Sequence, residues 1–128
     1  MQLAASQQID LKKVAKVAIK MFFNICQQWD LTSEQMQVLL GEPSTSLFYK
    51  YKRGDVSSLP KDTLERISYL SGVYKALHII FENECQANSW IKRPSADFNS
   101  KSALNIMLGG NVVDLAGIRK YLDSQAVE

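Results

Sequence analysis

Apolar residues recur along the chain at steps of three or four, which is the period of an amphipathic helix. In residues 9–29, Lys12, Lys16 and Lys20 repeat at steps of four and form a cationic stripe on one side of the predicted helix. A solvated surface is the ordinary interpretation of such a stripe, and a supporting contact to nucleic-acid phosphates is the alternative. The predicted inward face contains Val14, Ala18, Met21, Phe22, Ile25 and Trp29.

Two short helices joined by a tight turn are predicted next. Thr32, with Gln35 three residues later, has the form of a capping box that opens the first of them. Gly41 ends this helix, and Ser44 is a suitable N-cap for a second one that ends near residues 53–54. Two short helices connected by a turn that contains glycine are a candidate helix-turn-helix.

The remaining chain also carries helical periods. A long helix is predicted after Pro60, followed by helices near 84–91, 103–108 and 113–124, with a connector over 94–100. No segment longer than four residues alternates cleanly between apolar and polar, so strands are not predicted. The expected fold is all-α, with an N-terminal helix-turn-helix subdomain over 1–58 and a C-terminal helical domain over 59–128. Core packing is expected to continue across this soft boundary.

Composition limits the class of protein. The chain has 128 residues, of which 46% are hydrophobic and 22% charged, as in an ordinary globular protein. The formal net charge of +2 is too small for a binder driven by overall charge. Residues 1–58 carry seven basic and five acidic side chains, whereas 59–128 carry eight of each. Any affinity for nucleic acid must therefore come from a local cluster in the N-terminal half.

The second short helix has the composition of a recognition helix. Residues 44–53 contain three basic side chains and no acid, with hydroxyl groups gathered at the N-terminal end. In a major groove, the first residues of such a helix meet base edges, and its cations meet phosphates. Leu47, with Phe48 and Tyr51, is expected to face inward; a plain packing unit is the alternative. The candidate DNA-binding residues are Ser44, Thr45, Ser46, Tyr49, Lys50, Lys52 and Arg53.

Residues with catalytic or metal-binding chemistry are sparse. His78 is the single histidine and is expected to be a hydrogen-bonded helix residue, so no metal site is predicted. Cys26 and Cys85 stand alone and are expected to be reduced and packed. No nucleophile–base pair or cofactor fingerprint is found, so neither an enzyme, a cofactor nor a small-molecule substrate is expected. No membrane span or secretion signal is visible, which makes a cytoplasmic protein without a membrane partner the working expectation.

The order of several motifs resembles one family, the Xre/MbcA/ParS antitoxins. Residues 64–81 resemble its signature helix, and residues 29–54 resemble its helix-turn-helix, so that the similarity covers roughly 29–123. Further matching positions are Trp90, Arg93-Pro94, Ser102-Ala103-Leu104, Met107-Leu108, Gly110-Asn111-Val112, Asp114-Leu115 and residues 119–123. The chain departs from the family in its short connector, its tail without glycines and its tyrosine-rich recognition helix.

The resemblance implies an antitoxin of a type II toxin–antitoxin system. Its N-terminal part would repress the protein's own operon, and its C-terminal part would sterically block a RES-domain toxin, which depletes NAD. A homodimer is expected, because two-fold operators are read by two-fold proteins. Carried over by position, the toxin-facing residues would be Met107, Leu108, Gly109, Gly110, Asn111, Val112, Val113, Arg119, Tyr121, Leu122 and Asp123.

A stand-alone transcription regulator, in which residues 59–128 only mediate dimerisation, is the rival interpretation. A toxin gene transcribed alongside would discriminate between the two, since the regulator needs none.

Overall fold

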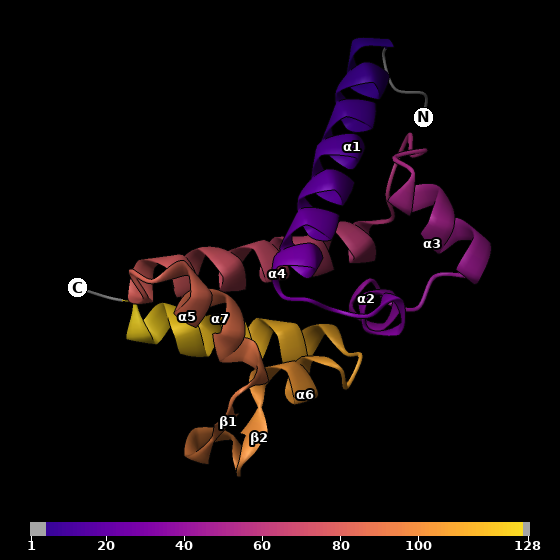
Figure 1. Ribbon diagram of the computed structural model, residues 1–128. Helices are drawn as coiled ribbons and strands as arrows, with labels where there is room; N and C mark the ends of the chain where they lie inside the picture. The colour runs from indigo at the N-terminus through magenta and orange to yellow at the C-terminus, as the bar shows by residue number, and fades with distance from the viewer. Residues whose placement is uncertain (1–4, 127–128) are drawn as a thin grey trace.

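A computed structural model describes residues 5–126 and is helical over most of that range. Helix α1 stands apart from the other helices at its N-terminal end, while α4 and α7 lie side by side (Figure 1). Among the described helices, none is long and apolar enough to cross a membrane. The α-helices are α1 (Ala5–Gln28), α2 (Ser33–Leu39), α3 (Thr45–Lys52), α4 (Lys61–Ile80), α5 (Glu84–Ser89), α6 (Ala103–Met107) and α7 (Val112–Gln125).

The predicted caps define α2 and α3. Thr32 Oγ1 accepts from the Gln35 N–H at 3.1 Å, and the Thr32 N–H donates to Gln35 Oε1 at 2.9 Å, which confirms the capping box. Ser44 caps α3 by accepting from the Leu47 N–H at 3.2 Å. Gly41, with φ of +92°, makes the left-handed turn that a side chain would strain. The helix-turn-helix expected from sequence is therefore present.

Helix α4 is the central element of the core. It runs in the same direction as α7, and Arg119 of α7 reaches the Ser68 carbonyl of α4 at 3.4 Å. The C-terminal half of α1 crosses α4 (Figure 1), and its Phe22 and Ile25 are buried, as is Trp29 immediately after the helix. One continuous cluster of buried side chains extends from Ala15 to Leu122, so residues before and after 58 share a core, as expected.

The N-terminal half of α1 leaves part of its apolar side uncovered. Val14 was expected to face inward but is 51% exposed, together with Leu11 and Val17. The adjacent Ala15 is only 1% exposed, so α1 is covered at this level on another side, and Val14 lies on the side that faces solvent. Helical periodicity identified most of the inward face, but it placed Val14 there in error, because spacing alone does not show how far around the helix the covered side extends.

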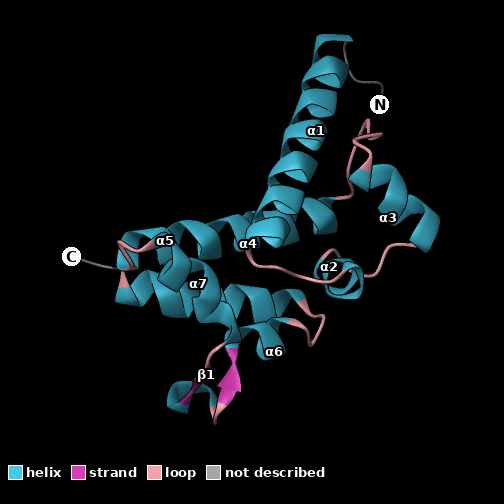
Figure 2. Ribbon diagram, in the orientation of Figure 1, coloured by secondary structure: helices cyan, strands magenta, loops and turns pink. Residues whose placement is uncertain are grey.

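The connector after α5 is more ordered than predicted. A short 3-10 helix (Trp90–Lys92) precedes strand β1 (Pro94–Ser95), which pairs antiparallel with β2 (Lys101–Ser102). This two-stranded sheet is the magenta element in Figure 2. The expectation of no strands was wrong here, because two-residue strands are too short to produce an alternating pattern. The pairing joins Pro94 to Ser102 and Ser95 to Lys101.

A cluster of three aromatic rings fixes this hairpin. Phe98, in the 3-10 turn Ala96–Phe98, lies 5.0 Å from the Tyr121 ring of α7 and 6.2 Å from the Trp90 ring. Tyr121 also donates its hydroxyl hydrogen to Asp97 Oδ2 at 2.6 Å. Residues that are distant in sequence thus hold the segment in place.

Candidate functional site

Helix α3 presents one side to the core and the opposite side to solvent. Phe48 is fully buried and Tyr51 is 5% exposed, as predicted for the inward side. Phe48 packs edge-on against Phe23 of α1, with 5.7 Å between the ring centroids. Leu47 was also expected inside but is 37% exposed, because it lies at the flank of the two residues that contact the core. These contacts determine which residues α3 exposes.

The outward side of α3 combines hydroxyl groups and cations. With 3.6 residues per turn, Ser46, Tyr49, Lys50 and Arg53 lie opposite the buried pair, and all four are exposed. They form a surface that we call the outward face of α3. Thr45 is exposed at its edge. The structure therefore brings together most of the predicted DNA-binding residues.

Ser44 and Lys52 occupy different positions from the other predicted residues. Ser44 uses its oxygen to cap α3, which leaves its hydroxyl hydrogen free to donate. Lys52 lies on the side of α3 that turns toward α1, with its ammonium group 5.8 Å from the centre of the Tyr49 ring. Neither residue belongs to the outward face itself.

The cations of α3 have no acidic partner within the part of the chain that the structure describes. The two ion pairs found there are Arg66–Asp62 and Arg119–Asp123. Lys50, Lys52 and Arg53 instead lie at the C-terminal end of α3, where the helix dipole favours positive charge. Their charges are thus available to an external anion.

The predicted partner-binding residues divide into three groups. Gly109, Asn111 and Val113 are exposed, with Leu108, Gly110 and Val112 partly buried among them. Val113 is 72% exposed, the highest value among the large apolar side chains of the described region. We call residues 108–113 the α6–α7 loop region; it includes the first two residues of α7.

Two of the predicted partner-binding residues belong to the core. Met107 is fully buried and Leu122 is 1% exposed. Both were expected to face a partner, and this expectation was wrong, because a partner could reach them only if the helices separated. Their apolar character serves the packing of α6 and α7.

Arg119, Tyr121 and Asp123 are engaged within the protein. Arg119 packs over Gly72, where an added Cβ would lie 2.4 Å from its Nε. Its Nε also lies 3.5 Å from Asp123 Oδ2. Hydrogen bonding to Asp97 raises the pKa of Tyr121, with smaller contributions from burial and from the charge of Asp97. The side-chain contacts of these three residues are thus made within the protein.

Arg66 is a connecting residue whose full role the sequence did not indicate. Its Nε lies 2.9 Å from Asp62 Oδ2, one helical turn earlier in α4. Its Nη2 donates to the Gly110 carbonyl at 2.9 Å, and a Cβ on Gly41 would lie 3.0 Å from its Nε. Arg66 therefore touches both the helix-turn-helix turn and the α6–α7 loop region. Only the Asp62 contact, four residues away in the same helix, is visible as a sequence signal.

Among the residues that the structure describes, the ionisable side chains outside these surfaces form no catalytic constellation. Nδ1 of His78 lies 2.9 Å from the Tyr74 carbonyl, consistent with the expected hydrogen-bonded helix histidine. Within the described residues, no cluster of three His, Cys, Asp or Glu side chains could hold a metal ion. Both cysteines are free, and Cys26 is buried as expected. Cys85 was also expected to be packed, but this was wrong, because it lies on the solvent side of the short helix α5.

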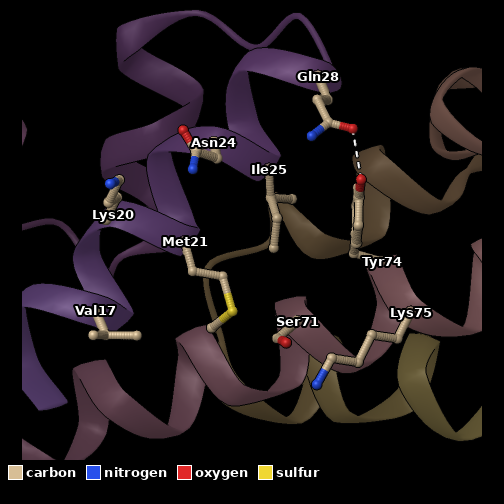
Figure 3. A pocket seen from close by; sticks show the side chains of 9 residues that line it. All are labelled: Val17, Lys20, Met21, Asn24, Ile25, Gln28, Ser71, Tyr74 and Lys75. Atoms are coloured by element: carbon tan, nitrogen blue, oxygen red, sulfur yellow. Dashed lines mark hydrogen bonds between the residues drawn. The ribbon is translucent and has the colours of Figure 1, made fainter.

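A mainly apolar groove lies between α1 and α4 (Figure 3). It has a volume of about 370 Å³, and its lining includes Val17, Met21 and Ile25 from α1 with Ser71 and Tyr74 from α4. At one end, the Tyr74 hydroxyl donates to Gln28 Oε1 at 2.6 Å (Figure 3). The groove continues the exposed apolar stripe of Leu11, Val14 and Val17 toward α4. The sequence showed these apolar residues but not that they remain uncovered.

Comparisons with known proteins agree with this geometry. Residues 13–72 match the family described as antitoxin Xre-like helix-turn-helix domain. The chain is also 43% identical over 107 residues to the uncharacterized protein y4oB of Sinorhizobium fredii (strain NBRC 101917 / NGR234), covering 84% of this chain and 82% of that protein. No solved structure matches the chain. The matched range contains α2, α3 and the outward face of α3.

Proposed function

Because the chain belongs to the Xre-like helix-turn-helix antitoxin family, a family of antitoxin-type DNA-binding regulators, we propose that it is the antitoxin of a type II toxin–antitoxin pair. In this proposal, residues 1–58 bind operator DNA and repress the protein's own operon. Residues 59–128 neutralise a cognate RES-domain toxin by steric occlusion of its active site. Neutralisation would be stoichiometric and would need no catalysis or cofactor.

The outward face of α3 is the observation that carries the DNA-binding part. Ser46 and Tyr49 offer groups that can read base edges, while Lys50 and Arg53 offer charges to the adjacent phosphates. The family match covers the same helix. The toxin-binding part rests on the resemblance of residues 64–123 and on the exposure of Val113 and Asn111. We therefore place the toxin contact on the α6–α7 loop region, without Met107 and Leu122.

Measurements of growth and of cellular NAD test the proposed antitoxin function. The adjacent reading frame of the operon is induced with and without this chain. We expect growth arrest with NAD loss in the absence of the chain, and rescue in its presence. If the neighbouring gene arrests growth without NAD loss and this chain restores growth, the antitoxin function stands, but the toxin belongs to a class other than the RES domain. If induction of the neighbouring reading frame does not arrest growth, its product is not the toxin, and the stand-alone regulator is favoured.

A substitution at Val113 tests the proposed toxin-binding surface. Val113→Asp places a carboxylate in the first turn of α7, where the helix dipole tolerates it, so the fold should persist. We expect rescue to be lost. The matched control is Ile79→Asp, which changes a residue of similar exposure, 66%, on α4. Rescue by Val113→Asp equal to that by the control would exclude Val113 from the contact.

We also propose that the protein is a homodimer and that a second copy covers the apolar stripe of α1. Leu11, Val14 and Val17 are 46%, 51% and 65% exposed and continue into the groove of Figure 3. A two-fold interface uses the same patch on both subunits, and burial of these side chains would supply its apolar centre. Val17→Asp should convert the dimer to monomer in sedimentation, whereas Val113→Asp should not. A monomeric wild type would remove this proposal.

A further inference from the structure

A groove lies between α1 and the C-terminal end of α3. Its volume is about 400 Å³, and we call it the α1–α3 groove. Ile19 and Tyr51 are buried side chains at its apolar base. Four cations line it: Lys16 and Lys20 from α1, and Lys52 and Arg53 from the end of α3. No acidic side chain is among its lining residues.

The charges around this groove are not compensated by the protein. Within the described residues, neither of the two ion pairs involves any of the four cations. The dipole of α3 accounts for Lys52 and Arg53, which lie at its C-terminal end. It does not account for Lys16 and Lys20, which lie in the interior of α1 and gain nothing from the dipole of that helix. Like charges brought together across a groove repel each other, so their arrangement favours an anionic ligand.

The position of the groove indicates which anion it accepts. Arg53 belongs both to the α1–α3 groove and to the outward face of α3, so the two surfaces are continuous. Lys12 lies one turn beyond Lys16 on the same side of α1 and extends the positive charge away from α3. A long anion that passes the outward face of α3 would therefore continue along α1. The backbone of a DNA duplex has this form, with phosphates repeating along each strand.

We propose that the α1–α3 groove binds the phosphodiester backbone of DNA beside the bases that α3 reads, with Lys16 and Lys20 as phosphate-contacting residues. This inference rests on the DNA binding in the proposed function and adds α1 to the interface. Phosphate contacts position a protein on the duplex but carry no sequence information. Helix α1 would therefore contribute affinity and orientation, whereas the outward face of α3 would contribute sequence discrimination.

Salt-dependent binding tests the proposal. The dissociation constants of the wild type and of Lys16→Gln/Lys20→Gln are measured by fluorescence anisotropy over a range of KCl concentrations. One probe is a duplex from the region upstream of the chain's own gene, and the other is an unrelated duplex. Each lost phosphate contact lowers the magnitude of the log–log salt slope by about 0.9. We expect the double variant to lower it by about two. Both probes should weaken by the same factor.

Two further variants make the result interpretable. Lys101→Gln/Lys120→Gln removes the same charge from exposed sites on β2 and α7 and should leave the slope close to that of the wild type. Lys16→Gln alone changes the α1–α3 groove without touching the groove of Figure 3, which Lys20 also borders. It should lower the slope by about one.

The outcomes separate this inference from the function on which it rests. If the wild type binds the upstream duplex and both α1 variants keep its salt slope, the groove does not contact DNA. The inference is then overturned and the proposed function stands. If the wild type binds neither duplex, the DNA-binding function itself fails. If the slope changes equally in the Lys101/Lys120 control, the effect is one of net charge, and the groove is again excluded.

Discussion

At the scale of single residues, Arg66 shows how one side chain can connect distant parts of a small protein. It is only 8% exposed, and it joins Asp62 of its own helix to the Gly110 carbonyl, 44 residues later in the chain. Its guanidinium group also lies against Gly41 in the turn before α3. The planar group holds several donors in a fixed arrangement, which suits a residue that bonds partners in different directions.

Replacement of Arg66 should therefore destabilise the protein. Arg66→Ala leaves the Gly110 carbonyl without its donor and opens space beside Gly41, so we expect a loss of about 2 kcal/mol in the free energy of unfolding. Urea denaturation followed by circular dichroism measures it. Arg93→Ala removes an exposed arginine that bonds Ser89 and should cost less than about 0.5 kcal/mol. Equal losses in the two variants would show that the Gly110 contact contributes little.

Burial of Cys26 should make stability depend on alkaline pH. Burial raises the pKa of this thiol from 9.0 to about 12. Above pH 9 the unfolded chain loses the thiol proton while the folded chain keeps it, so the free energy of unfolding falls as pH rises toward 12.

Between pH 8 and pH 10.5, this one group should account for about 2 kcal/mol of the fall, at about 1.4 kcal/mol per pH unit. In urea denaturation, the free energy of unfolding of Cys26→Ala should fall by about 2 kcal/mol less than that of the wild type over this pH range. Cys85→Ala should decline as the wild type does, because that thiol is exposed in both states. An unchanged decline in Cys26→Ala would mean that the thiol ionises in the folded protein.

At the scale of elements, α3 divides its residues between packing and recognition. Phe48 and Tyr51 attach it to the core, and this attachment directs Ser46, Tyr49, Lys50 and Arg53 outward. A helix of eight residues would be marginal in isolation. Its orientation therefore depends on the two aromatic side chains and on its caps.

Substitutions on the outward face of α3 should distinguish contacts that depend on charge from contacts that do not. Lys50→Ala should weaken binding to operator and unrelated DNA alike and lower the salt slope by about one, since it removes one phosphate contact. Tyr49→Ala should reduce affinity for the operator while leaving the slope unchanged, because no charge is lost. Anisotropy titrations at several salt concentrations distinguish these effects. A slope that Lys50→Ala does not change would remove the phosphate contact assigned to Lys50.

At the scale of the whole molecule, one hydrophobic core joins the surfaces proposed for DNA and for the toxin. Helix α7 contributes Leu115, Ile118 and Leu122 to it, and all three are buried against the remaining helices. The Val38 side chain of α2 also lies near Gly110, at 3.9 Å from the position of an added Cβ. The two proposed functions thus depend on the same packed structure.

Deletion of residues from Gly109 onward should consequently unfold the protein, because it exposes the side of α4 that α7 covers. Loss of several large buried side chains costs more than the stability of an ordinary small domain. We expect loss of the cooperative thermal transition together with loss of DNA binding. Val113→Asp should keep both. A truncated chain that still melts cooperatively and binds DNA would show that residues before Gly109 fold independently.

The sequence by itself determined the helices, the helix-turn-helix and the caps at Thr32 and Ser44. These features depend on residues within a few positions of each other, and local periodicity and hydrogen bonding report them directly. The family resemblance also followed from the order of motifs, and the match over 13–72 agrees with it for the helix-turn-helix. The sequence likewise identified the residues that form the outward face of α3.

Only the tertiary structure decided which apolar residues are covered and which cations converge. Met107 and Leu122 are as apolar as Val113, yet contacts between α6, α7 and α4 bury the first two and leave Val113 outside. The lysines of α1 and the end of α3 are more than thirty residues apart in sequence, and they meet where α1 packs against α3, as at Phe23 and Phe48. Burial and the convergence of charge depend on contacts between distant segments, and a local pattern carries no record of those contacts.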